Sequence, residues 1–360
     1  MFQGRDDQMS DKFKNVTEAQ LKDYIKTILL EVGLPENDAS IVSNLMTEAD
    51  MLGVDTHGVF RLPQYVKRLI AGGINKNPNI SIVREKSAMA LLNGDNAMGH
   101  LVMEKAANIA VAKAKDHGVA WVGANSSNHA GPASLYARIP LKEDMIGIYV
   151  AVGSSNHVPP WGGTDLLLST NPIAISIPSM KRPPIVLDMA TTVAAYGKVK
   201  EKLQRKEEMP VGWMIDKEGK PLTDPSKSSE GFLLPIGEAK GYGLALMFGI
   251  LAGTLNGAAF GKAVVDFNAD AKSFTNTGHF IIAVDIAAFT DVDQFKRNID
   301  DVWEQMKGSS VLPGFDEVRL PGERSNNLFN ERKKNGIPIH DNLKQALDQL
   351  SEQLNTKKIY

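Results

Sequence analysis

The stretch VAWVGANSSNHAG, residues 119–131, joins an apolar run to a small polar loop with one histidine. The apolar run predicts a buried strand, and the residues after the loop favour a helix. Small residues around His129 let backbone and ligand approach closely, and an imidazole can exchange protons near neutral pH. The loop is therefore a candidate catalytic site, with the ordinary alternative that a single loop histidine lies at the surface or caps a helix.

The composition is typical of a soluble globular protein. Its 360 residues exceed one typical core, which predicts two domains. The 40 basic and 42 acidic residues nearly cancel, so no charge excess favours nucleic acid or an anionic membrane. No run approaches the roughly 18 apolar residues of a membrane span. The absence of cysteine excludes a disulfide framework and a thiolate nucleophile, and we expect a cytoplasmic protein.

Three helices are predicted near the start of the chain. A capping-box pattern at Thr17–Gln20 opens the first, and the others cover about residues 35–52 and 62–70. The polar group 55–57 lies in the junction between the last two. Residues 1–16 are expected to form a disordered extension.

From residue 80 the sequence becomes rich in short segments with strand character. One helix, residues 101–116, interrupts them, and a turn at 216–220 divides a charged excursion. Small residues recur every fourth position over 241–255, which predicts a helix that packs closely on a neighbour. The predicted strands are residues 80–83, 88–92, 119–122, 146–152, 173–177, 185–187 and 280–284, and the later predicted helices are 292–306 and one from Asp341.

Several familiar catalytic patterns are absent from the sequence. No G-x-G-x-x-G follows a strand, so an ordinary Rossmann phosphate loop is not encoded. No G-x-S-x-G or H-E-x-x-H pattern occurs, and the seven histidines are scattered singly. A serine hydrolase or a zinc enzyme is therefore disfavoured, and we expect no bound metal.

A second candidate site covers residues 56–65. If His57 heads a helix, Arg61 and Tyr65 follow one and two turns later on the same face, and Thr56 immediately precedes them. An arginine fork beside hydroxyl and imidazole groups suits a carboxylate ligand. The alternative, in which Tyr65 is a core aromatic and Arg61 a surface residue, is equally open from these residues.

Two further segments carry polar groups at predicted element ends. Asp188–Thr192 closes an apolar strand with a carboxylate and two hydroxyls, which is also the pattern of a helix N-cap. Lys240 lies among glycines at a predicted helix start, where backbone amides and an ammonium together favour phosphate.

Seven short motifs, taken in order, make the sequence similar to a known family. Each is weak alone, but the ordered set resembles the malate/L-lactate dehydrogenase family of the non-Rossmann type over about residues 17–350. That family also includes ureidoglycolate dehydrogenase, sulfolactate dehydrogenase and cyclic-ketimine reductases, and the run 188–199 looks most like the ureidoglycolate branch. The motifs are VDTHG (54–58) with Arg61 and Tyr65, NHAG (128–131), PWGG (160–163), TNP (170–172), DMAT (188–191), KGYGL (240–244) and LPGE (320–323).

The resemblance implies an α/β (α+β) fold with a large, mostly antiparallel sheet and a helical domain, assembled as a homodimer. The helical domain would combine residues 17–78 with about 290–360, and residues 79–290 would bind NAD or NADP without the glycine fingerprint. The basic residues within 198–206 suit the 2′-phosphate of NADP but are more typical of a solvated face. The sequence therefore does not decide between the two cofactors.

Residue roles follow from the resemblance position by position. His129 is similar to the family's proton donor and acceptor, and Thr56, His57, Arg61 and Tyr65 match its substrate-binding region. The expected reaction transfers a hydride between NAD(P) and C2 of a small 2-hydroxy carboxylate that Arg61 anchors. The matched cofactor contacts are Ser154, Asp188, Met189, Ala190, Lys240, Pro321, Gly322 and Glu323.

Some positions depart from the usual pattern of the family. Thr56 stands where many members have serine, Ala130 replaces a frequent aromatic residue, and 153–157 replaces a Thr-Asn pair. Pro140 interrupts a helix that is usually continuous. These changes affect the expected pocket wall and substrate choice. The first alternative function is a cyclic ketimine reductase, followed by a non-catalytic dinucleotide-binding dimer and, last, a hydrolase of small acids.

Overall fold

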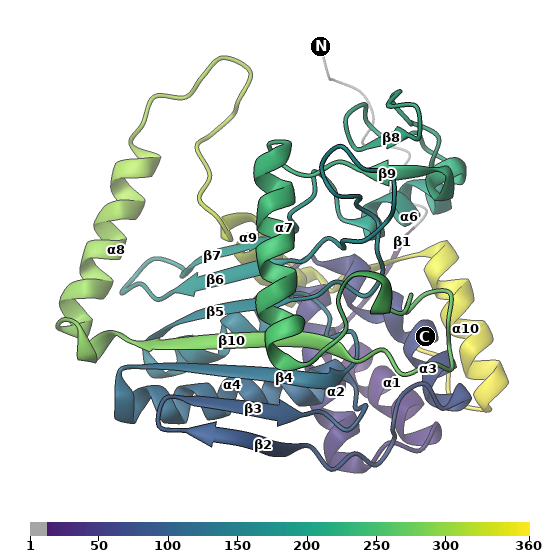
Figure 1. The fold of residues 1–360 in the computed structure, drawn as a ribbon, viewed down its shortest axis with the longest axis horizontal. Helices are drawn as coiled ribbons and strands as arrows, with labels where there is room; N and C mark the ends of the chain where they lie inside the picture. Colours follow the sequence, from purple (N-terminus) through teal and green to yellow (C-terminus); the bar gives the residue numbers. More distant parts are fainter. Residues whose placement is uncertain (1–12) are drawn as a thin grey trace. The chain divides into compact units, whose positions relative to one another are not determined.

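The computed structural model describes residues 13–360, which divide into two compact units (Figure 1). The first unit combines residues 13–70 with Ser325–Tyr360, and the second is Ala71–Arg324. No helix in this described part of the chain is both long and apolar enough to cross a membrane. Most of the expected disordered extension, residues 1–12, lies outside the described residues.

The first unit consists of helices and one short strand pair. The capping box at Thr17 and Gln20 opens the first helix as predicted. Phe13–Val16, expected within the extension, instead form strand β1, because they pair antiparallel with β11 (Ile337–His340) from near the other end of the chain. The helices and 3-10 turns are α1 (Glu18–Glu31), α2 (Glu36–Met51), η2 (Asp55–His57), η3 (Val59–Arg61), most of α3 (Leu62–Ala71), most of α9 (Glu323–Asn335) and α10 (Asp341–Leu354).

A seven-stranded sheet forms the centre of the second unit, in the order β2-β3-β4-β10-β5-β6-β7 (Figure 1). Every neighbouring pair is antiparallel except β3 with β4. The expected α/β (α+β) fold with a large, mostly antiparallel sheet is therefore confirmed. The strands are β2 (Ser81–Lys86), β3 (Met89–Asn93), β4 (Val119–Ser127), β5 (Met145–Ala151), β6 (Ile173–Ile177), β7 (Ile185–Met189) and β10 (Thr277–Asp285).

Helices pack on both faces of this sheet. The long helix α4 (Gly99–His117) and the short α5 (Ser134–Ala137) contact one face, and α7 (Ala239–Ala252) crosses the other (Figure 1). The small residues of α7 point inward, and a Cβ on Gly249 would lie 2.1 Å from the Phe260 ring. The predicted close packing along this helix is confirmed.

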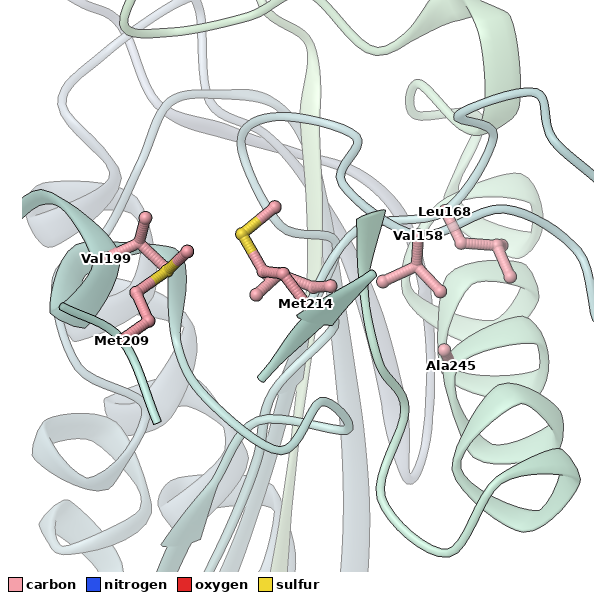
Figure 2. Packing of buried hydrophobic residues seen from close by; sticks show 7 residues of the cluster. Val158, Leu168, Val199, Met209, Met214 and Ala245 are labelled. Carbon is pink, nitrogen blue, oxygen red and sulfur yellow. The ribbon is translucent and has the colours of Figure 1, made fainter. Parts of the chain in front are cut away.

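A smaller hydrophobic core lies between α7 and the charged segment of residues 198–229. This segment and the residues beside it contain a helix the sequence pattern did not reveal, α6 (Tyr196–Arg205), and the strand pair β8 (Met214–Asp216) and β9 (Gly231–Leu233). Figure 2 shows Val158 and Leu168 beside Ala245 of α7, with Met214 between them and the α6 side. The remaining long helix, α8 (Val292–Lys307), belongs to the second unit.

Candidate functional site

His129 lies in the second unit, two residues after β4 ends. The preceding residue, Asn128, is fully buried and donates from its amide to the carbonyl oxygens of Asn96 (3.1 Å) and Ala97 (3.0 Å). Its own amide oxygen accepts a hydrogen bond from Thr275 Oγ1 (3.0 Å). The backbone is therefore fixed immediately before a half-buried imidazole.

The residues after His129 are fixed as well. The Tyr136 hydroxyl of α5 donates to the carbonyl of Ala130, and the Gly131 N–H donates to His129 Nδ1 at 3.4 Å. The ring of Phe267 stacks on the imidazole, with centroids 5.2 Å apart.

A buried polar network supports the loop from the sheet. His279 on β10 contacts the Tyr149 hydroxyl through Nδ1 (2.8 Å) and Ser127 Oγ through Nε2 (3.1 Å). Burial lowers the pKa of His279 to about 4, so it is neutral at pH 7. A neutral imidazole can donate through one nitrogen and accept through the other, which suits two hydroxyl partners.

Asp188 lies at the end of β7 and contacts the first residue of α5. Its carboxylate accepts from the Ser134 N–H at 2.9 Å. This is a long-range contact and not the local helix N-cap of the sequence alternative, because the following helix α6 has Ala195 at its N-cap without a side-chain hydrogen bond. Asp188 is exposed as a whole residue, but its carboxyl group is surrounded by neighbouring protein groups. The loss of hydration raises the pKa of Asp188, against the hydrogen bonds from Ser134 that lower it.

The structure gathers most of the predicted cofactor contacts around β6 and β7. The Pro321 carbonyl accepts from Val186 N–H (3.0 Å), which places the turn 321–323 beside the strand that ends in Asp188-Met189. Thr191, next to Ala190, accepts from Ile236 N–H (3.0 Å) in the loop that leads to the exposed Lys240. Ser154 follows Gly153, whose N–H donates to the Asn171 side chain just before β6.

The basic residues of 198–206 are mostly engaged within the second unit. Lys200 Nζ donates to Asn268 Oδ1 (2.6 Å). Lys202 pairs with Glu207 (2.6 Å), and Arg205 pairs with Glu201 (2.5 Å). These basic side chains already have partners within the protein, so their presence does not require the 2′-phosphate of NADP. The choice between NAD and NADP stays open.

In the first unit, the second candidate site spans two 3-10 turns and the start of α3 rather than one helix, because Gly58 separates η2 from η3. Arg61 is 9% exposed, so it is not a surface residue, and its Nε donates to the Thr56 carbonyl (2.9 Å). Burial lowers the pKa of Arg61 and raises that of the fully buried Tyr65. Thr56 Oγ1 contacts His57 Nδ1 at 2.9 Å.

Asp50 on α2 holds the turn that carries Arg61. Its carboxylate accepts from the Val59 N–H at 2.8 Å. Burial raises the pKa of Asp50 well above its ordinary value, and Asp55 adds to this, while Val59 N–H and Arg332 oppose it.

Sequence reasoning did not identify four residues of these two sites: Asp50, Tyr149, Phe267 and His279. Tyr149 and His279 alternate with apolar residues in strands, so they look like ordinary core positions. Phe267 lies in a loop without periodicity. For Asp50, a carboxylate among the inward positions of a predicted helix was a usable signal.

Comparisons with known proteins agree over nearly the whole chain. A family profile described as malate/L-lactate dehydrogenase matches residues 16–348. The malate/(S)-sulfolactate dehydrogenase of Methanothermus fervidus is 37% identical over 334 residues, covering 93% of this chain and 96% of its own. The NAD(+)-dependent ureidoglycolate dehydrogenase of Escherichia coli K12 is 31% identical, covering 92% and 94%.

Solved structures give the same result. The malate dehydrogenase of Pyrococcus horikoshii superposes with a TM-score of 0.89 at 35% identity, over 99% of both chains. The delta1-piperideine-2-carboxylate reductase of Pseudomonas syringae superposes with a TM-score of 0.81 at 26% identity, over 94% of this chain and 99% of its own.

Proposed function

The chain belongs to the malate/L-lactate dehydrogenase family and is a 2-hydroxy acid dehydrogenase, and from this premise we propose which groups carry the reaction. The substrate is a small 2-hydroxy or 2-oxo carboxylic acid of the malate, lactate or ureidoglycolate type. His129 accepts the hydroxyl proton in the oxidative direction and returns it in the reductive direction. Arg61 binds the carboxylate, with Thr56, His57 and Tyr65 completing the substrate-binding region.

The residues around β7 fit a bound dinucleotide. Lys240 presents an exposed ammonium at the start of α7, where backbone amides also favour an anionic pyrophosphate. Gly322 has a φ of +86° and lies against Val186, where a Cβ would come within 2.9 Å of the Val186 carbonyl, so the turn 321–323 can approach β7 closely. Bound NAD or NADP would supply the hydride acceptor or donor. We propose that residues 79–290 hold it through Ser154, Asp188, Met189, Ala190 and Lys240, and that the turn Pro321, Gly322 and Glu323, which lies beyond that range in the sequence, adds further contacts.

The observation that best supports a catalytic His129 is the contrast between its backbone and its side chain. The backbone is fixed by buried hydrogen bonds at Asn128 and Ala130, whereas the imidazole keeps partial access. Such preorganisation is what proton transfer requires.

The test is a spectrophotometric assay of the reduced nicotinamide. Purified protein would be given NADH or NADPH with pyruvate or oxaloacetate, and NAD or NADP with malate, lactate, sulfolactate or ureidoglycolate. Turnover of one acid pair supports the proposal and identifies the cofactor. Cofactor binding without turnover of any of these acids would contradict the proposed substrate class.

Cyclic ketimine reduction is the second candidate, favoured by the likeness to the Pseudomonas syringae reductase. A cyclic imine carboxylate in the same assay separates the two reactions. Activity on the imine alone would replace the first proposal.

The absence of cysteine supports a cytoplasmic location, which cell fractionation would test.

We further propose that the chain forms a homodimer through the α7 side of the sheet. Under α7, Phe280, Val150 and Ile173 form a covered row across the strands. The next two rows on the same face are also apolar, and their side chains are partly buried or, at Val119, exposed. They are Trp121, Ile282, Ile148, Ile175 and Leu187, and then Val119, Val284, Ile146, Ile177 and Ile185.

The outer face of α7 is apolar as well. Leu244, Met247, Ile250 and Leu251 are exposed, with Met247 at 51%. Strands that are apolar on both faces are typical of a sheet covered on both sides, and a large exposed apolar surface marks an interaction site. A second copy fits because the surface combines an apolar helix ridge with apolar strands beside it, so each copy can cover the other symmetrically.

A further inference from the structure

The segment Asp266–Asn268 connects the two predicted functional regions of the second unit. Phe267 is 1% exposed, and its ring lies 5.2 Å from the His129 ring with 27° between the planes. Its backbone N–H donates to the carbonyl of Ser154 at 2.9 Å. One residue therefore contacts both the proposed acid/base and a proposed cofactor-binding residue.

This segment is fixed although it has no regular secondary structure. Asp266 Oδ1 accepts from the N–H groups of Asn268 (2.7 Å) and Ala269 (3.3 Å), and Asn268 Oδ1 accepts from Lys200 (2.6 Å). Burial acts to raise the pKa of Asp266, but hydrogen bonds from Asn268 and Ser155 outweigh it, and the pKa is lowered. The carboxylate therefore stays ionised at neutral pH and keeps its turn closed.

We propose that Phe267 is a positioning residue for His129, which rests on the proposed catalytic role of that histidine. The aromatic face restricts rotation of the imidazole, while Gly131 N–H holds its Nδ1 edge. The imidazole ring thus keeps one orientation for proton exchange with the substrate oxygen. A displacement of about 1 Å in such a group can cost on the order of 100-fold in rate.

The test compares Phe267→Leu with Phe274→Leu, the same change at a 48% exposed position of the same loop. For Phe267→Leu we expect kcat to fall about tenfold with cofactor affinity unchanged. The solvent deuterium isotope effect on kcat should rise, because proton transfer becomes slower than the other steps. Phe274→Leu should match the wild type, and an unchanged kcat and isotope effect in Phe267→Leu would overturn the proposal.

A second measurement does not depend on turnover. The ring proton signals of His129, assigned by their loss in His129→Asn, should shift and broaden in Phe267→Leu as the ring current of Phe267 is removed. Unshifted signals would contradict the positioning even if no substrate is found. If Phe267→Leu does not fold, Asp266→Ala opens the turn without changing the core, and the same shift and a smaller fall in kcat are expected. Their absence there would also overturn the proposal.

Discussion

Asp50 lies so close to Gly58 that a Cβ at position 58 would come within 2.1 Å of the Asp50 Oδ1 atom. The same carboxylate accepts from the Val59 N–H, the first residue of the turn that ends in Arg61. Position 58 of the VDTHG motif therefore has to be glycine, because any side chain there would collide with the buried Asp50 carboxylate. This gives the motif a structural role in addition to any contact with substrate.

Replacing Gly58 with alanine should destabilise the protein by about 1–3 kcal/mol, the usual cost of overpacking. Urea unfolding measures this loss. In an Asp50→Ala background the same change should cost less, because the atoms that the new methyl group would strike are gone. An equal cost in both backgrounds would show that the close contact with Asp50 is not the cause.

Much of the fold could be predicted because its elements follow local rules. The capping box at Thr17 and Gln20 predicted α1 from the sequence, and the repeat of small residues predicted α7. Strand β1 could not be predicted, since its four residues are ordered only by β11 near the other end of the chain. Helix α6 was also missed: only Gly197 and Val199 of this charged helix are buried, which leaves too little apolar periodicity to read.

His129→Asn should lower kcat by roughly 10²–10⁴-fold, the contribution of a positioned general base. Cofactor affinity should stay near that of the wild type, because the proposed contacts around β7 are unchanged. Steady-state kinetics and titration with reduced cofactor measure the two effects. His117→Asn, at the exposed end of α4, is the matched control, and an equal loss in both variants would argue against a catalytic His129.

The candidate sites were predictable only as far as single residues carry a chemical signature. His129 and Arg61 stood out by residue type and setting. The groups that hold them, such as Phe267 and Asp50, are recognised only by contacts between segments distant in sequence. The alternative in which Arg61 is a surface residue is wrong. Its burial depends on tertiary packing, which the helical spacing of the sequence does not reveal.

Acid should destabilise the protein through its buried histidines. Burial lowers the pKa to about 3 for His100 and to about 4 for His157 and His279. Each stays neutral in the folded state while the unfolded chain takes up a proton below about pH 6.5, so the stability is lost as pH falls from 6.5 toward 4. The raised pKa of Asp50 acts in the opposite sense, because its ionisation costs stability as pH rises.

His157→Phe isolates one of these contributions. The new ring can keep the stack on Tyr196, whose centroid lies 3.8 Å from that of His157, while the titrating group is removed. Between pH 7 and pH 5 the wild type should lose about 2 kcal/mol more of its unfolding free energy than the variant. Urea titrations at both pH values measure the difference, and parallel losses would refute the assignment.

The proposed homodimer gives a prediction about Met247, which is exposed at the centre of the outer face of α7. If a second copy covers this face, Met247→Glu would bury an unpaired carboxylate at a dry interface, which costs several kcal/mol. Light scattering after size exclusion should then show the wild type at twice the 39.1 kDa chain mass and the variant at the single mass. Val211→Glu places the same charge on a more exposed apolar residue outside α7, and it should remain a dimer. A wild-type monomer, or a dimer that Met247→Glu does not weaken, would mean that another surface or no self-association explains the apolar face.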